Sequence, residues 1–245
     1  MKRWQSGFTI VEVVLFLAIT GLLTVGLLAG VSAALRQQQY HDAVQSFAGF
    51  IRDQYSRVIS IENDRGDRDT CPVKGATNDG ARGQSNCVVV GRYVKSTNSE
   101  ARSFTTYPLY ALKRSGVWTY SYSESEANTY TVGWGAQVRS LTVTNTIGRE
   151  LALLIYRDPD SGQVIVRTND APYSPANINN FIRNMQPNGG MYTADLQLRQ
   201  REFCIYDTGW SVGQRLSVFL GAKAGSSEAV TVGHATKGCD NEATA

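Results

Sequence analysis

The chain has 245 residues, of which 42% are hydrophobic and 18% are charged, a composition that excludes a disordered polyelectrolyte and suits one or two folded domains. Its 24 Lys and Arg residues nearly balance 21 Asp and Glu residues, and the net charge of +3 argues against specific nucleic-acid binding. Because there are two histidines, and four cysteines without a Cys-x-x-Cys pair, we expect no metal site and no other cofactor.

The chain begins with a short basic segment followed by a long apolar run. Residues 1–7 read MKRWQSG, and residues 8–34 contain a single charged residue, Glu12. As a helix, these 27 residues would be about 40 Å long, which exceeds the roughly 30 Å hydrocarbon core of a bilayer. The positive leader predicts a single-pass membrane protein whose N-terminus is cytoplasmic and whose remainder is exported.

Two ordinary explanations of this segment are a plain membrane anchor and a secretory signal peptide. An anchor explains the length but not Glu12, because a carboxylate inside a membrane helix costs up to a few kcal/mol. A signal peptide could be cut after the small residues 31–33, leaving a chain that starts at Ala34. Its apolar region would be unusually long and would contain a charge, so we favour a third explanation.

The stretch Gly7-Phe8-Thr9-Ile10-Val11-Glu12 resembles the processing signal of type IV prepilins, and the resemblance extends over roughly residues 1–60. In that family a membrane peptidase cuts after the glycine, the new N-terminus is methylated, and the glutamate meets the amine of a neighbouring subunit. The resemblance implies cleavage between Gly7 and Phe8, methylation of Phe8 and an assembly role for Glu12. The implied partners are a prepilin peptidase, other pilin subunits, an inner-membrane assembly platform and membrane lipid.

The spacing of this motif is chemically sensible. Glu12 lies four residues after Phe8, so the two groups share one face of a helix. A buried ammonium and a buried carboxylate offset part of each other's desolvation. A simpler alternative is that Glu12 is stabilised by the dipole of its own helix N-terminus. Further along, Gly26 and Gly30 have the small-xxx-small spacing that allows close helix approach, although glycine is also common in membrane helices.

The helix is predicted to continue beyond the membrane, over residues 8–61. Between Phe8 and Ile61 there is no proline. Apolar residues recur at helical spacing, which predicts one packed face and one wet face: Tyr40, Val44, Phe47, Ile51, Tyr55 and Val58. We therefore expect residues 8–34 to lie in a membrane or filament core and the second half of the helix to pack on a sheet.

Residues 62–245 are predicted to form an exported, β-rich globular domain. Residues 62–86 are polar and glycine-rich, as in a surface loop. Strands are expected at residues 87–94, 102–112, 117–122, 137–144, 151–157, 163–168, 192–198, 202–206, 215–220 and 229–232. Short links favour antiparallel pairing. Pro108 indicates an edge strand or a break, residues 158–162 a hairpin turn, and Ile178, Phe181, Ile182 and Met185 one short helix.

The expected fold is thus α+β, a long transmembrane helix packed on an antiparallel sheet, in a pilin-like arrangement. The four cysteines suit an exported domain. Three pairings are possible, and proximity in sequence favours Cys71–Cys87 and Cys204–Cys239 over the others, with four reduced thiols as the alternative. A disulfide-bounded C-terminal region is a feature of many pilins.

Two classes of function remain. We find no nucleophile elbow, P-loop or zinc-protease motif, so we expect no enzyme. The first class is a structural subunit of a type IV pilus-like filament, a minor pilin or a pseudopilin, that serves adhesion, motility, DNA uptake or secretion. The second is a membrane-anchored surface binding protein that never polymerises. Aromatic residues on the strands could form a binding face in either class, but core packing is their favoured use: Tyr107, Tyr110, Trp118, Tyr120 and Tyr122.

The motif predicts how the mature protein begins. Cleavage after Gly7 removes Lys2 and Arg3, and Phe8 becomes a methylated N-terminus. Mass spectrometry of the N-terminal peptide of the membrane-extracted protein measures this directly. A mature chain that starts at Ala34 would instead support the signal-peptide interpretation.

Overall fold

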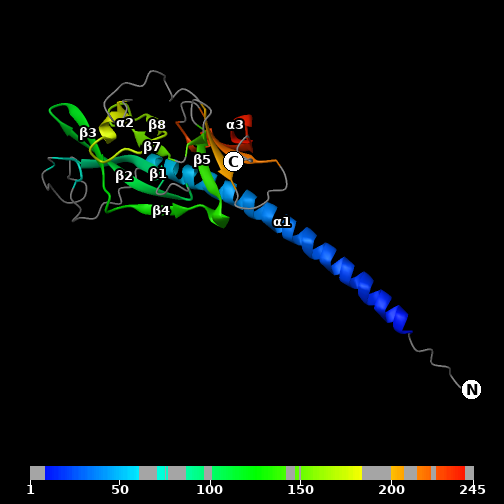
Figure 1. Ribbon diagram of the computed structural model, residues 1–245. Coiled ribbons are helices and arrows are strands. Elements are labelled where there is room, and N and C mark those ends of the chain that lie inside the picture. The colour runs from blue at the N-terminus through cyan, green and yellow to red at the C-terminus, as the bar shows by residue number, and fades with distance from the viewer. Residues whose placement is uncertain are drawn as a thin grey trace, which may run out of the picture.

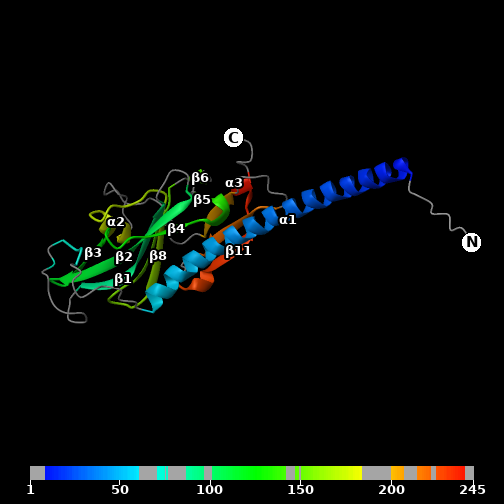
Figure 2. The same ribbon diagram turned by 90° about the horizontal axis from the view of Figure 1, so that it is seen from below.

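The computed structural model describes residues 9–60, 71–74, 76, 87–96, 101–141, 147–148, 150–183, 200–206, 214–221 and 225–240. A long helix projects from a domain of antiparallel strands, so the fold is α+β (Figure 1). The apolar N-terminal part of the helix extends well beyond the domain, and the C-terminal part lies along it (Figure 2).

Helix α1 runs without interruption from Ile10 to Ile59. The prediction of one long helix is confirmed, with its end two residues earlier than expected. The helix passes through Gly21, Gly26 and Gly30 because none of them is followed by a proline or a polar cluster that would break it. At its C-terminus the Ser60 N–H donates to the Ser56 carbonyl and closes the last turn.

The described strands form two antiparallel sheets. The six-stranded sheet has the order β3-β2-β1-β7-β8, with β4 also pairing with β2. Its strands are β1 (Cys87–Ser96), β2 (Ser103–Arg114), β3 (Val117–Tyr122), β4 (Asn128–Thr131), β7 (Ala152–Arg157) and β8 (Val164–Asn169). The five-stranded sheet has the order β11-β10-β9-β5-β6 and consists of β5 (Gln137–Leu141), β6 (Ile147–Gly148), β9 (Arg201–Tyr206), β10 (Leu216–Leu220) and β11 (Val230–His234).

Short helical segments connect or cover the strands. They are η1 (Gly133–Gly135), α2 (Ile178–Ile182), η3 (Ser227–Ala229) and α3 (Lys237–Asp240). The predicted short helix is confirmed as α2, which uses Ile178, Phe181 and Ile182, whereas Met185 lies outside the described residues. The predicted strand at residues 192–198 also lies outside them. Strands β4 and β6 were not predicted from the sequence.

Pro108 corrects one expectation about β2. This strand lies inside the sheet, with β1 on one side, and Pro108 pairs there opposite Arg92. On its other side, β2 pairs with β4 as far as Thr106 and with β3 from Leu109 onward. Pro108 therefore occupies the point where the ladder changes partner, and a missing backbone donor is tolerated there.

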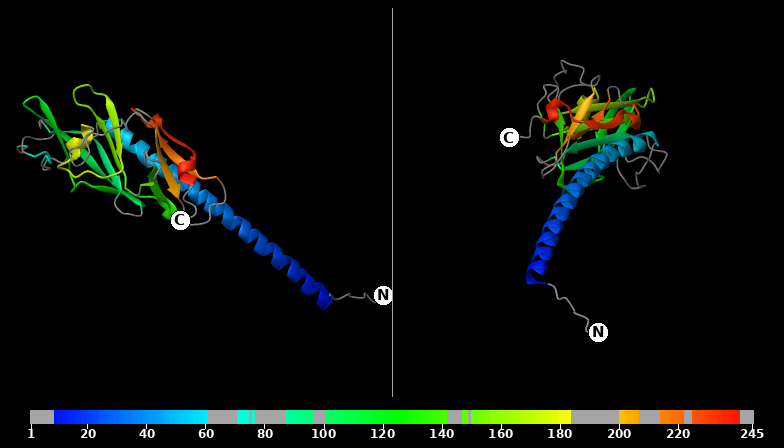
Figure 3. Two further views of the ribbon diagram at one scale, coloured as in Figure 1. Left: turned by 45° about the horizontal axis from the view of Figure 1, so that its top comes forward. Right: turned by 90° about the vertical axis from the view of Figure 1, so that its right-hand side faces the viewer.

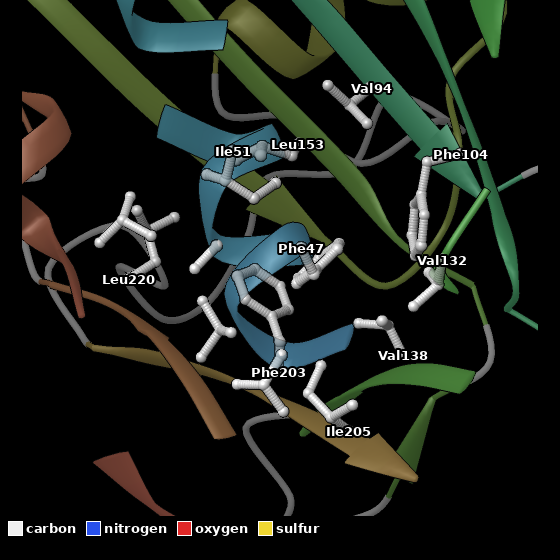
Figure 4. Close-up of a cluster of buried hydrophobic side chains, with 14 of the residues drawn as sticks. Phe47, Ile51, Val94, Phe104, Val132, Val138, Leu153, Phe203, Ile205 and Leu220 are labelled. Atoms are coloured by element: carbon white, nitrogen blue, oxygen red, sulfur yellow. The ribbon is translucent and has the colours of Figure 1, made fainter. Parts of the chain in front are cut away.

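The principal core lies between the second half of α1 and both sheets. Phe47 and Ile51 of α1 are fully buried against Phe104 and Leu153 of the six-stranded sheet, and Phe203 closes the cluster from the five-stranded sheet (Figure 4). The Phe47 and Phe203 rings meet edge to face at 5.8 Å. Each sheet alone would leave its apolar face exposed, so the helix is the element that joins them.

Polar contacts fix the position of α1 on the domain. The Tyr40 hydroxyl donates to the Ile205 and Leu216 carbonyls at 3.2 and 3.0 Å, and it accepts from the Leu216 N–H at 2.8 Å. Twelve residues further on, the Arg52 guanidinium donates to the Val230 carbonyl. Tyr40 thus holds α1 at the Leu216 end of β10, and Arg52 holds it at the opposite end, where Val230 pairs with Leu220.

A second apolar cluster covers the opposite face of the six-stranded sheet. Tyr93, Tyr122 and Leu154 lie beneath Tyr173 and Phe181, whose rings stack at 4.4 Å. The Tyr173 N–H donates to the Tyr93 hydroxyl, and the Tyr122 hydroxyl donates to the Tyr173 carbonyl. Burial raises the pKa of Tyr93 well above its usual value, so the hydroxyls of this cluster stay neutral hydrogen-bonding groups.

Two glycines give a matched test of the close packing between β1 and β7. A Cβ on Gly91 would lie 2.4 Å from the Ile155 carbonyl oxygen, whereas one on Gly49 would meet nothing within 4 Å. We expect Gly91→Ala to lower the free energy of unfolding by about 2 kcal/mol or more, and Gly49→Ala to raise it by up to about 1 kcal/mol. Urea denaturation of both variants measures this, and equal stabilities would contradict the described β1–β7 packing.

Candidate functional site

The N-terminal half of α1, from Ile10 to Leu35, is an apolar surface that no other described residues cover. Its large side chains are exposed, with Ile10 at 81% and Leu22 at 75%. Among the described residues, α1 is the one helix that is long and apolar enough to cross a membrane. We call residues 10–35 the stalk.

Hydroxyl groups on the stalk do not add polarity to its surface. Thr20, Thr24 and Ser32 each donate to the carbonyl four residues earlier, at 2.8, 2.7 and 2.8 Å. Since these hydroxyls are satisfied within the helix, they do not need water or a neighbour. Between Glu12 and Arg36 the stalk therefore presents a surface that suits lipid or another apolar helix.

Glu12 lies in the first turn of α1. Thr9 is the N-cap, and its hydroxyl accepts from the Glu12 N–H at 3.3 Å. The spacing Thr-x-x-Glu is that of a capping box. This signal for the start of a helix is present in the sequence, although it was not among the predicted features. A carboxylate at this position is favoured by the helix dipole by up to about 1 kcal/mol.

The cap explains where the helix begins, but it does not remove the free-energy cost of moving the Glu12 carboxylate out of water. Its side chain is exposed, and the residues on either side of it are apolar. A charge of this kind requires a cationic partner once water is excluded. Gly7 and Phe8, which are expected to supply the cleavage site and the new amine, lie outside the described residues.

All four cysteines are paired. Cys71 is joined to Cys87 and Cys204 to Cys239, with Cα–Cα distances of 6.1 and 5.5 Å. The first bond attaches the segment before β1 to the small apolar cluster around Tyr110. These are the pairs that proximity in sequence favours.

The second disulfide belongs to a cluster that holds α3 on the outer face of the five-stranded sheet. The Glu202 carboxylate accepts from the N–H and hydroxyl of Thr236, and the Tyr206 hydroxyl donates to the Cys239 carbonyl at 3.0 Å. Glu202, Cys204 and Cys239 also place potential metal ligands within 4.8 Å of one another. Because both sulfur atoms are bonded to each other, neither is available as a thiolate ligand.

The aromatic residues of the strands serve packing, as expected. Tyr107, Tyr110, Tyr120 and Tyr122 are buried, and Trp118 is partly buried. Near Trp118, the Lys113 ammonium lies 2.9 Å from Asp160. The nearby Trp118 indole N–H and the Lys113 ammonium lower the pKa of the exposed Asp160 carboxyl.

One conspicuous residue was not recognised in the sequence. Trp134 is 61% exposed in η1, and its backbone is left-handed, with φ 57° and ψ 23°. A bulky residue in this conformation costs about 1 kcal/mol or more. The signal was the unusual Gly-Trp-Gly sequence, in which glycines flank the strained position.

No protein-family model, curated protein or solved structure matches this chain.

The α3 cluster predicts how the Cys204–Cys239 bond contributes to stability. The disulfide spans 35 residues, so Cys204→Ala with Cys239→Ala should lower the free energy of unfolding by about 2–4 kcal/mol under oxidising conditions. Urea denaturation measures the loss. The same double variant compared under reducing conditions is the control, where the difference should nearly vanish. A loss of the same size under reducing conditions would show that packing, not the bond, is responsible.

Proposed function

We propose that this chain is a structural subunit, a minor pilin or pseudopilin, of a type IV pilus-like filament. The observation that carries the proposal is that one unbroken helix provides both an exposed apolar stalk and the core of the exported domain. A plain anchor needs the first of these features, but a filament subunit needs both, because movement of the stalk must carry the domain with it.

The contacts of α1 support such coupling. Phe47, Ile51 and Tyr55 are fully buried, and Tyr40 and Arg52 hydrogen-bond to strands of the five-stranded sheet. Removing the helix would expose the apolar faces of both sheets, at a cost well above the usual stability of a domain. The domain therefore follows the helix as a rigid body when the stalk moves from membrane to filament.

Glu12 gives the stalk a specific assembly contact. After cleavage behind Gly7, the leader cations are gone, and the Phe8 amine of an adjacent subunit is the available cationic partner. Each subunit then offers one carboxylate and one amine, a head-to-tail contact that does not close on itself. This arrangement supports open filament growth.

The proposed life cycle follows from these parts. The chain is inserted with a cytoplasmic N-terminus, processed and methylated by a prepilin peptidase, and held in the membrane by its stalk. An inner-membrane assembly platform then transfers it into a filament of other pilin subunits, outside the cytoplasm. Adhesion, motility, DNA uptake and secretion are the activities that such filaments serve.

The assembly contact is tested by changing Glu12. Glu12→Leu removes the charge and should still be inserted and cleaved, but it should enter filaments several-fold less than the wild type. Glu12→Gln keeps hydrogen bonding without the charge and should be intermediate. The measurement is the amount of subunit in sheared filaments relative to the amount in the membrane.

Val14→Leu is the matched control, since it changes an exposed apolar residue of the same turn without altering charge. It should assemble as the wild type does. Equal incorporation of wild type and Glu12→Leu would overturn the pairing mechanism and favour a membrane-anchored binding protein that does not polymerise.

A further inference from the structure

The end of the domain nearest the stalk carries an exposed aromatic residue and several cations. Helix α3 and strand β5 lie toward the end of the domain from which the stalk emerges (Figures 1 and 2). Segment η1, which contains Trp134, leads into β5, and α3 contains Lys237. We call this end the base of the domain. Other views show the same arrangement, with the stalk leaving beside the strands of the five-stranded sheet (Figure 3).

Strand register places the base close to the end of the apolar stalk. Tyr40 hydrogen-bonds to the carbonyl of Ile205, and the next residue, Tyr206, pairs with Gln137 at the start of β5. Trp134 precedes Gln137 by three residues, so η1 leads into β5 at the end of the sheet that Tyr40 contacts. Along α1, Tyr40 is about 7.5 Å beyond Leu35, the last large apolar residue of the stalk.

That distance matches the thickness of a lipid headgroup layer. Each headgroup layer adds roughly 5–7 Å to the hydrocarbon core of a bilayer. When Leu35 lies at the boundary of the hydrocarbon core, Arg36 enters the headgroup layer and the base of the domain faces that layer. Trp134 is then at the depth where tryptophan is favoured, since its ring is apolar and its indole N–H is polar.

The charges at the base complement an anionic surface. Arg36 and Lys237 are exposed, and Arg215 lies with its guanidinium carbon 5.1 Å from the centre of the Tyr206 ring. The guanidinium carbon of Arg139 also lies 5.1 Å from the centre of the Tyr206 ring. The Arg215 guanidinium also donates to the Cys239 carbonyl at 3.4 Å. The opposing acids are Asp42 on α1 and Asp240 on α3.

Trp134 itself makes no contribution to the apolar clusters of the described residues, although it adopts a strained backbone conformation. Glycine would adopt the same conformation without strain. Packing among the described residues therefore does not explain the exposed indole, whereas a docking surface would.

We propose that the base of the domain docks onto the anionic lipid headgroups of the membrane that the stalk spans, through Trp134, Arg36, Arg215 and Lys237. This inference rests on the membrane insertion in the proposed function and not on filament assembly. Docking would hold the domain upright on the membrane before the subunit is extracted, and extraction would have to break these contacts.

The test uses the full chain with Trp4→Phe and Trp210→Phe, so that Trp118 and Trp134 are its two tryptophans. It is placed in vesicles of phosphatidylcholine, with and without phosphatidylglycerol. The acyl chains carry bromine next to the headgroup and quench nearby tryptophans. We expect quenching of this chain to increase when phosphatidylglycerol is present and to fall in high salt. Adding Trp134→Phe to this chain should remove the lipid-dependent component, while Trp118, near the start of β3 and next to the turn at the far end of the domain, remains unquenched in both proteins.

A backbone-matched pair separates docking from stability. Ser115, in the turn between β2 and β3 at the far end of the domain, also has a positive φ, of 47°. Trp134→Gly and Ser115→Gly should both keep or raise the melting temperature. Only Trp134→Gly should reduce the protection that phosphatidylglycerol gives to amide hydrogens of residues 225–240 against exchange.

Flotation with the vesicles distinguishes failure of this proposal from failure of membrane insertion. A chain that floats but shows the same quenching with and without Trp134→Phe overturns docking and leaves the membrane stalk intact. A second contrary outcome is that brominated lipid does not quench Trp134, while Trp134 is protected from acrylamide only at high protein density. This result would overturn the proposal and assign the base of the domain to a contact between copies of the chain. A chain that does not float at all contradicts the membrane insertion on which the proposal rests.

Discussion

The structure depends on one constraint: none of the other described residues covers the apolar stalk of α1, which therefore needs an apolar partner surface. Fifteen large apolar side chains between Ile10 and Leu35 are exposed to solvent. Burying them would contribute on the order of 20 kcal/mol or more, whereas one carboxylate in a membrane helix costs a few kcal/mol. Glu12 therefore does not prevent burial of the stalk, but it favours burial against a surface that offers a cation over burial in lipid alone. Lipid satisfies the apolar residues, and a neighbour with a free amine satisfies Glu12 as well.

The same helix is also the centre of the β-rich domain, and this explains its length. A membrane span alone would end near Leu35, yet α1 continues to Ile59 with a buried stripe. Phe47 and Ile51 fill the space between two sheets that do not bury each other's apolar faces without them. Stalk and domain are thus one mechanical unit, whether the cover of the stalk is lipid or other subunits.

Much of this architecture is predictable because its signals are local and strong. The stalk, the continuation of the helix and most strands follow from runs of apolar residues and their period, and β3 occurs at the expected residues. The features that could not be predicted from the sequence depend on contacts between residues that are far apart in the chain. Pro108 resembles an edge signal, but its position is set by β2 exchanging β4 for β3 as a partner. Strand β4 is short and polar, and it is defined by its pairing with β2 and by Tyr130 stacking on Phe50. For the candidate sites, the motif around Glu12 is readable from sequence, whereas the placement of Trp134 at the base requires the register of β5 and β9.

The most direct test of the account asks what covers the stalk in the cell. A photo-crosslinking amino acid at Leu22, one of the most exposed stalk residues, reports its neighbours in cells that assemble filaments. The same amino acid at Gly49, on the exposed face of α1 within the domain, is the comparison. The account predicts that position 22 crosslinks to the α1 helices of other filament subunits when filaments are present, and to lipid when assembly is blocked. Crosslinks from position 22 to lipid alone under both conditions would contradict it and leave the stalk as a simple anchor.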